Sequence, residues 1–305
     1  MSRDDTSPPL VSPSDLRSRV AERFLASGAS GARLELESRE EIVVDGGISF
    51  VVRVLAPRFG LAAQQAKAAS QSRYAGGSAS RSPFLPPYEP TLLVGAITPT
   101  HVCLLNKYNL IDRHLLIVTR EYEEQERPLT AEDLVAARIC LGAIDGLVFY
   151  NSAAAAGASQ SHKHLQLVPF PLGPNGERFP LDRAFGSALA GGHDAARELG
   201  YRHRIAKLGG GDDLAVYREL VTENGLELGR EPDRGSGADH RLAPYNLLMT
   251  RDWMLVLPRS SGATGPIEVN ALGFAGTLVV RSEEDLALVR EVGPLEILGR
   301  VGQRT

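Results

Sequence analysis

The residues HKHLQL at 162–167 alternate between two kinds of side chain with a period of two. A β-strand points successive side chains to opposite faces, so the alternation predicts a strand over 162–170 with one polar face. A run of small residues, NSAAAAGA, precedes the strand and predicts a loop in front of it. One face of the strand carries His162, His164 and Gln166. The other face carries Lys163, Leu165 and Leu167.

Apolar stretches of strand composition extend the same sheet, and short turn-like pieces between 92 and 119 favour antiparallel pairing. Helices are indicated at 14–28, with Ser14 as N-cap, and at 129–146, with Thr130 as N-cap, as well as at 212–225 and 282–289. Strands and helices do not alternate as regular βαβ units, so we predict an α+β fold with an antiparallel sheet. The predicted strands are 48–55, 91–97, 101–108, 114–121, 147–152, 162–170, 245–250 and 253–258.

The chain of 305 residues is 43% hydrophobic, which is sufficient for a sizeable core. Residues 1–13 read as a polar, proline-bearing tail, and residues 14–305 as a single domain. Within that domain, small and polar residues at 60–82 and a glycine- and charge-rich stretch at 228–243 predict two mobile insertions.

Composition also limits the class of function. The net charge of -4 argues against a general nucleic-acid binder, although a local basic pocket for a phosphorylated small molecule remains compatible with it. No stretch has the length and character of a membrane span, and the N-terminus lacks an apolar secretory core. The two cysteines, Cys103 and Cys140, lie in apolar stretches and are expected to be buried free thiols. We therefore expect a cytoplasmic protein.

The stretch GASQSHKHLQ combines residues suited to phosphate chemistry. Gly157, Ala158 and Ser159 allow the backbone to approach a ligand, so that successive N–H groups can bind phosphate oxygens, and Gln160 adds a side-chain donor. An imidazole facing such a cradle suits attack on phosphorus, because it is neutral near pH 7 and forms a high-energy phosphoramidate. Gln166 can hydrogen-bond a phosphate oxygen but cannot shuttle a proton.

Two simpler interpretations of the histidine pair stay open. A His-x-His pair on a strand can hold zinc, but it needs further ligands, and neither cysteine lies at a ligand-like spacing. The pair can also belong to a solvated strand face, an interpretation that the phosphate-cradle loop directly upstream makes less favourable.

The segment NSAAAAGASQSHKHLQLVP resembles the signature of the diadenosine tetraphosphate phosphorylases, also called ATP adenylyltransferases, of the histidine-triad superfamily. SPFLPPYEPTLLVG, HVCLLNKYNLIDRHLLIVTREYEEQ, PYNLLMTRDWMLVLPRS and NALGFAGTLVV resemble further segments of that family in the same order, from about residue 48 onward. The resemblance implies a histidine-triad-like antiparallel sheet with flanking helices and a C-terminal extension.

The resemblance also implies a reaction. His164 is expected to attack the α-phosphorus of diadenosine tetraphosphate and expel ATP, and inorganic phosphate then attacks the adenylyl-histidine to give ADP. His162 and Gln166 complete the catalytic set. Hydrolytic members of the superfamily carry a third histidine where this chain has Gln166, so transfer to phosphate is expected rather than hydrolysis. A divalent cation, expected to be Mg²⁺, would neutralise adjacent phosphate charges.

Other positions match nucleotide-binding segments of the family. They are Asn106 and Lys107 in LLNKYN, Asn151, Gly157, Ala158, Ser159 and Gln160 before the histidine strand, and Asn270, Ala271, Leu272, Thr277 and Arg281 near the C-terminus. The family's substrate-contacting N-terminal lysine has two candidate counterparts, Arg58 and Lys67. The run AAAA stands where the family has a glycine-proline-glutamate-like run, which removes a carboxylate and a proline from the loop.

Two alternative functions follow from the same residues. A sugar-1-phosphate nucleotidylyltransferase of the same superfamily has a similar histidine core and would prefer UDP-glucose as donor. A nucleotide-binding sensor without activity is compatible with the altered AAAA loop. Among the remaining residues, His114 is expected to turn or pack the following strand, and the acidic run at 120–126 is expected to be solvated.

Overall fold

The computed structural model describes residues 8–58, 82–191, 199–226 and 241–305. An eight-stranded sheet in the order β10-β12-β11-β8-β9-β7-β5-β4 forms its centre, and its described pairings are antiparallel. The strands are β4 (Leu93–Ala96), β5 (His101–Leu105), β7 (Leu115–Thr119), β8 (Gly146–Asn151), β9 (His164–Pro169), β10 (Arg204–Lys207), β11 (Tyr245–Met249) and β12 (Trp253–Pro258).

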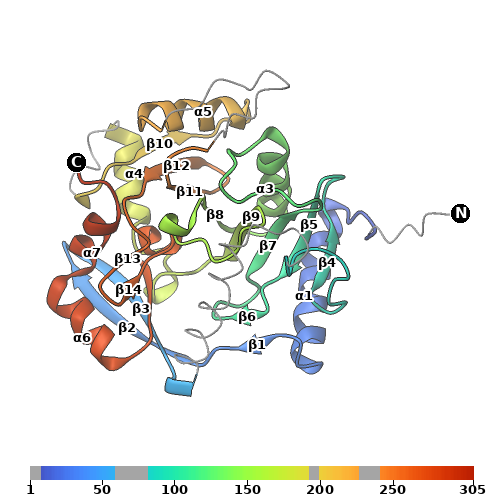
Figure 1. Ribbon diagram of the computed structural model, residues 1–305, viewed down its shortest axis with the longest axis horizontal. Coiled ribbons are helices and arrows are strands. Elements are labelled where there is room, and N and C mark those ends of the chain that lie inside the picture. The colour runs from blue at the N-terminus through green and yellow to red at the C-terminus, as the bar shows by residue number, and fades with distance from the viewer. Residues whose placement is uncertain (1–7, 59–81, 192–198, 227–240) are drawn as a thin grey trace, which may run out of the picture.

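A three-stranded sheet joins the two ends of the chain. β2 (Ser38–Asp45) and β3 (Ile48–Leu55) form an antiparallel hairpin, and β15 (Thr277–Val280) pairs in parallel with β3. Two short pairs complete the strands: β1 (Leu34–Glu35) with β6 (Tyr108–Asn109), and β13 (Ala263–Thr264) with β14 (Ile267–Glu268). In Figure 1 the hairpin lies beside the C-terminal helices.

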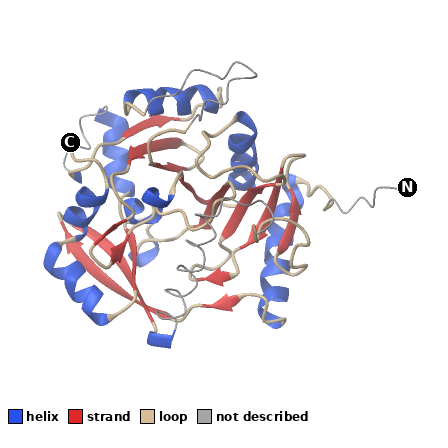
Figure 2. Ribbon diagram, in the orientation of Figure 1, coloured by secondary structure: helices blue, strands red, loops and turns tan. Residues whose placement is uncertain are grey.

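Helices surround the strands at the periphery of the molecule (Figure 2). α1 (Pro13–Ala29), α3 (Ala131–Ala143) and α5 (Asp213–Glu223) cover one face of the large sheet. Their residues Leu16, Leu134 and Leu220 share a buried core with Leu165 and Leu167 of β9. Burial of this face explains why the odd-numbered positions of the histidine strand are apolar apart from Lys163.

The opposite face of the large sheet holds two separate apolar clusters. One cluster joins Phe149 of β8 to the three-stranded sheet, to the short helix η5 (Ala271–Ala275), and to α4 (Asp182–Gly191), α6 (Glu283–Val292) and α7 (Pro294–Val301). The other lies on β4, β5 and β7, where Leu116 packs with Phe84. Gln166 pairs with Phe149 on one side and Leu116 on the other, so the polar side chains of β9 lie where the two clusters meet.

The structure confirms the α+β class, the antiparallel sheet and the four predicted helices. Thr130 forms the expected N-cap, as part of a capping box with Asp133. The first helix is capped by Ser12, not Ser14, because Pro13 occupies its first turn. Val11 and Pro13, predicted to lie in a polar tail, belong to the folded part: Val11 is buried and its N–H donates to the backbone oxygen of Ala96, and Pro13 begins α1.

Several elements escaped prediction. β2 is an edge strand with mostly charged or exposed residues, and β10 is a four-residue strand at the edge of the large sheet. α4, α7 and β15 were also missed. The insertion predicted at 60–82 lies outside the described residues apart from Ser82, and the one at 228–243 apart from 241–243. Every helix in the described ranges is too short or too polar to cross a membrane.

Candidate active site

His164 opens β9 and is held as a neutral imidazole with a defined tautomer. Its Nδ1 donates a hydrogen bond to the backbone oxygen of His162 at 2.8 Å, because a carbonyl can only accept. The proton therefore sits on Nδ1, and Nε2 keeps its lone pair. Burial lowers the pKa of His164 to about 4, against the opposing effect of that hydrogen bond. The ring of Phe84 packs against the imidazole at 5.0 Å between centroids.

His162 has the opposite tautomer. Its Nε2 lies 2.9 Å from the backbone oxygen of Thr119 and 3.1 Å from that of Glu121, so Nε2 carries the proton. Nδ1 accepts from the hydroxyl of Ser82 at 2.7 Å. Both ring nitrogens are thus engaged, and burial lowers the pKa of His162. The predicted strand began two residues too early, since His162 forms only an isolated bridge, with Glu124, before β9 begins at His164.

Gln166 lies two residues beyond His164 and faces the same side of the sheet. Its Oε1 accepts a hydrogen bond from Nε2 of His114 at 2.9 Å. His114 in turn lies 3.1 Å from Nδ2 of Asn106. His114, expected from the sequence to be a packing residue, thus joins the polar group around His164, and Asn106 directs its amide to His114.

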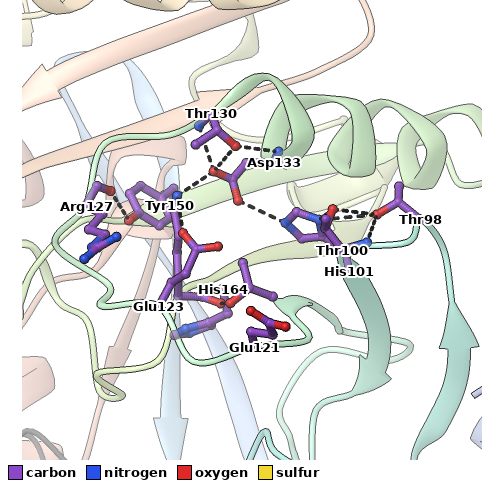
Figure 3. Close-up of polar contacts among 12 residues, drawn as sticks. Thr98, Thr100, His101, Glu121, Glu123, Arg127, Thr130, Asp133, Tyr150 and His164 are labelled. Atoms are coloured by element: carbon purple, nitrogen blue, oxygen red, sulfur yellow. Dashed lines mark hydrogen bonds and ion pairs between the residues drawn. The ribbon is translucent and has the colours of Figure 1, made fainter. Parts of the chain in front are cut away.

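The opposite face of the histidine strand carries a buried ion pair. Lys163 is fully buried, and its Nζ lies 2.6 Å from Oδ2 of Asp133 in the first turn of α3. His101 approaches the other carboxylate oxygen at 3.0 Å, and the Thr130 N–H donates to Asp133 at 2.7 Å (Figure 3). Burial alone would raise the pKa of Asp133, but the His101 hydrogen bond and the Lys163 charge hold it at about 2. The pair ties the backbone between His162 and His164 to α3.

Gln125 connects the histidine strand to β8. Its Oε1 accepts from the His164 N–H at 2.9 Å, and its Nε2 donates to the backbone oxygens of Asn151 and His164 at 2.7 and 3.2 Å. The side chain is 1% exposed. The expectation of a solvated segment at 120–126 was therefore wrong for Gln125, since the backbone around it runs beside Ser161 and Lys163.

The loop before the histidines approaches the C-terminal segment closely. The short helix η2 (Ala154–Ala156) ends at Gly157, whose φ of 92° favours glycine. A Cβ at Gly157 would lie 2.7 Å from Cα of Asn270. Asn151 joins the same two segments, because its Oδ1 accepts from the Ala271 N–H at 2.9 Å. The fold thus brings together two segments that are 120 residues apart in sequence at this hydrogen bond, and both contain positions predicted to bind nucleotide.

Arg259, just after β12, donates hydrogen bonds to both of these segments. Its guanidinium is 2% exposed and donates to the backbone oxygens of Ala156 at 3.2 Å, Ser261 at 2.7 Å and Val269 at 2.8 Å. It also donates to Oδ1 of Asn246 on β11. No carboxylate in the described part of the chain pairs with Arg259, and burial lowers its pKa to about 9.

The other predicted positions lie in varied places. Leu272 packs in the core, and Thr277 is buried in β15. Arg281 pairs with Glu268 at 2.6 Å. Lys107, Ala158, Ser159 and Gln160 are exposed or half-buried, Arg58 pairs with Glu37, and Lys67 lies outside the described residues. Sequence reasoning missed Gln125, Asn246 and Arg259, whose only sequence signal is a polar residue within an acidic run, inside an apolar strand, and directly after a strand, respectively.

The two parts of the chain match two family descriptions. Residues 6–187 match "Ap4A phosphorylase N-terminal domain" and residues 197–304 match "ATP adenylyltransferase C-terminal domain". This chain belongs to the Ap4A phosphorylase family. Strands from both regions share the eight-stranded sheet, since β11 in the second pairs with β8 in the first.

Two curated relatives come from Saccharomyces cerevisiae. Diadenosine 5',5'''-P1,P4-tetraphosphate phosphorylase 2 is 28% identical over 219 residues, which cover 62% of this chain and 64% of the relative. Protein APA1 is 27% identical over 228 residues, covering 65% of this chain and 66% of the relative. The matched region therefore spans slightly less than two thirds of each relative.

Solved structures confirm the fold over nearly the whole chain. The crystal structure of yeast Ap4A phosphorylase Apa2 superposes with a TM-score of 0.72 at 22% identity, covering 95% of each chain. The structure of Apa2 with AMP gives a TM-score of 0.72 at 24% identity, and the one with Ap4A gives 0.71 at 22%; each covers 95% of this chain and 98% of Apa2. Nucleotides are thus ligands of a protein with this fold.

Proposed function

We propose that this protein catalyses the reversible phosphorolysis of diadenosine tetraphosphate to ATP and ADP through an adenylyl-His164 intermediate. Membership of the Ap4A phosphorylase family and the name of one yeast relative, diadenosine 5',5'''-P1,P4-tetraphosphate phosphorylase 2, support this proposal. The proposed ligands are diadenosine tetraphosphate, ATP, ADP and inorganic phosphate. The buried free thiols Cys103 and Cys140 support a cytoplasmic location.

The observation that carries the proposal is the state of His164. A neutral imidazole with its proton on Nδ1 presents the Nε2 lone pair to phosphorus. As the N–P bond forms and the bridging P–O bond breaks, ATP leaves with the electron pair as an anion. Positive charge then develops on the ring, and the backbone oxygen of His162, 2.8 Å from Nδ1, stabilises it.

The second step reverses the first with another nucleophile. An oxygen of inorganic phosphate attacks the α-phosphorus, the P–N bond breaks, and the electron pair returns to Nε2 of His164, which releases ADP. No group needs to remove a proton from this nucleophile, because phosphate is already an anion near pH 7. Gln166 suits this step, since an amide can bind a phosphate oxygen but cannot act as a base toward water.

The backbone around Gly157 is the proposed cradle for the polyphosphate, and Asn270 borders it. Among the residues the structure describes, no group of three or more His, Cys, Asp or Glu side chains is arranged to hold a metal ion. We therefore propose that Mg²⁺ enters on the phosphates of the nucleotide, and we assign the steps above to the protein's own residues.

Chromatography of the products tests the function directly. The protein is incubated with diadenosine tetraphosphate with and without phosphate, and the expected products are ATP and ADP only with phosphate. Without phosphate, an AMP-labelled protein with release of ATP is expected, and His164→Ala should abolish both results. ATP and AMP in the absence of phosphate would instead identify a hydrolase, and turnover that survives His164→Ala would refute the proposed nucleophile. Preferential turnover of UDP-glucose would favour the sugar-1-phosphate alternative.

A further inference from the structure

The amide of Gln166 lies at the end of a hydrogen-bond chain that has a single direction. The Tyr108 N–H, which can only donate, lies 3.1 Å from Oδ1 of Asn106. The other end of that amide, Nδ2, therefore faces His114 and donates to Nδ1 at 3.1 Å. Because Nδ1 accepts, the proton of His114 resides on Nε2, which donates to Oε1 of Gln166 at 2.9 Å.

His114 keeps this direction because it is neutral. It is 8% exposed, and burial lowers its pKa to about 4 despite the hydrogen bond to Gln166, with the nearby His164 lowering it further. A protonated His114 would point an N–H at the amide nitrogen of Asn106, so the chain holds only for the neutral ring. With Oε1 of Gln166 engaged, its NH₂ group is the end left to meet a ligand.

We propose that His114, oriented by Asn106, is a positioning residue that makes Gln166 a donor toward the reacting phosphates and so determines phosphate, not water, as the acceptor. An NH₂ group attracts the anionic oxygens of the incoming phosphate. If the amide were reversed, its oxygen would repel phosphate and accept a hydrogen bond from water. This inference rests on the proposed function and deepens it by naming what sets the acceptor.

The chain can be broken or reversed by single substitutions. His114→Phe keeps a ring of similar size and removes the donor to Gln166. Asn106→Asp reverses the chain, because a carboxylate can only accept: His114 would then carry its proton on Nδ1, accept on Nε2, and draw the NH₂ group of Gln166 away from the ligand. Asn106 is half-buried, so the second variant keeps the test available where the first fails to fold.

The first experiment isolates the adenylyl-enzyme and measures how fast it releases ADP with phosphate and AMP in buffer alone. The ratio of these two rates compares phosphorolysis with hydrolysis. Both variants are expected to lower the ratio of phosphorolysis to hydrolysis by about tenfold, the size of one hydrogen bond to a charged group. In a Gln166→Ala background, His114→Phe should change the ratio by less than about twofold, because its effect acts through Gln166. His203→Phe is the matched control, since His203 is also buried but packs against Tyr201.

A binding readout separates this inference from the proposed function. His114→Phe should weaken binding of AMP by about tenfold and leave binding of adenosine unchanged, because only AMP carries the phosphate. A wild-type protein without phosphorolysis would refute the proposed function, while the AMP and adenosine affinities would still decide the role of His114. The inference is overturned if both variants keep the wild-type acceptor ratio and AMP affinity, or if His114→Phe acts equally in the Gln166→Ala background.

Discussion

Lys163→Met is the substitution that best tests how the histidine strand is held. Lys163 stands between His162 and His164 in the sequence, and its side chain is fully buried. Its Nζ lies 2.6 Å from Oδ2 of Asp133, which is 1% exposed. Methionine has a similar length and fills the same space without a charge. The variant therefore leaves the Asp133 carboxylate buried with only His101 and Thr130 as partners.

The size of the effect follows from this burial. Removing one partner of a buried ion pair costs about 3–5 kcal/mol. Because His101 and Thr130 still donate to Asp133, we expect the free energy of unfolding to fall by about 3 kcal/mol, at the lower end of that range. For a chain of 305 residues, with an unfolding entropy of about 2.1 cal/mol/K per residue, that loss corresponds to a fall in Tm of roughly 5 °C. Asn in place of Asp133 removes the uncompensated charge, so Lys163→Met combined with Asp133→Asn should lose less than the two single variants together.

The pH dependence of the free energy of unfolding in acid should also change in Lys163→Met. Asp133 has a folded pKa of about 2, below its ordinary value of 3.8, so it stabilises the fold above about pH 4 and loses that contribution as pH falls toward 2. Without the charge of Lys163, the folded pKa of Asp133 rises. The loss of stability between about pH 5 and pH 2 should then be smaller in Lys163→Met than in the wild type, because the folded and unfolded pKa values of Asp133 differ less.

Urea unfolding followed by circular dichroism at several pH values measures both effects. Lys207→Met is the control, because Lys207 is an exposed lysine at the end of β10 and its replacement should be nearly neutral. A loss below about 1 kcal/mol in Lys163→Met, with an unchanged acid limb, would show that the ion pair does not anchor the histidine strand.

Three further predictions concern the site itself. Arg259→Met removes five hydrogen bonds, and although Ala156 and Val301 keep other donors, the acceptors of Asn246, Ser261 and Val269 lose the guanidinium, so the free energy of unfolding should fall by about 3 kcal/mol and KM for nucleotide should rise; denaturation and steady-state kinetics test this. Gly157→Ala should lower turnover by roughly tenfold or more, because its Cβ would meet Asn270, whereas Gly142→Ala on α3, where a Cβ meets open space, should keep full turnover. The folded pKa of about 4 for His164 predicts that kcat/KM falls only below about pH 5, since protonation removes the Nε2 lone pair; an acid limb near pH 6.5 would contradict it.

The period-two alternation at 162–167 was sufficient to predict a strand and its two faces, because side chains of any strand alternate through covalent geometry alone. Thr130 and Asp133 likewise identify the start of α3, since a capping box is made within one turn. The family resemblance added His164 as the proposed nucleophile and the three segments predicted to bind nucleotide. Each of these features depends on residues that are close in sequence or on a resemblance that quotes them directly.

The partners of buried polar groups could not be predicted in this way. Arg259 meets Ala156, which is 103 residues away, and His114 meets Gln166 at a separation of 52. Gln125 sits in an acidic run that reads as solvated, yet sheet pairing places it between His164 and Asn151. A buried donor must find an acceptor, but which acceptor it finds depends on strands that meet only after the chain has folded.

The same distinction applies to the chemistry of the site. The residue types along HKHLQ establish that a nucleophile and an amide can face one ligand. The protonation of His164 and the direction of the Gln166 amide depend on a carbonyl at 2.8 Å and an imidazole at 2.9 Å, which only the folded sheet provides. Hydrogen bonds have direction, and that direction is set by the neighbour in space and not by the neighbour in sequence.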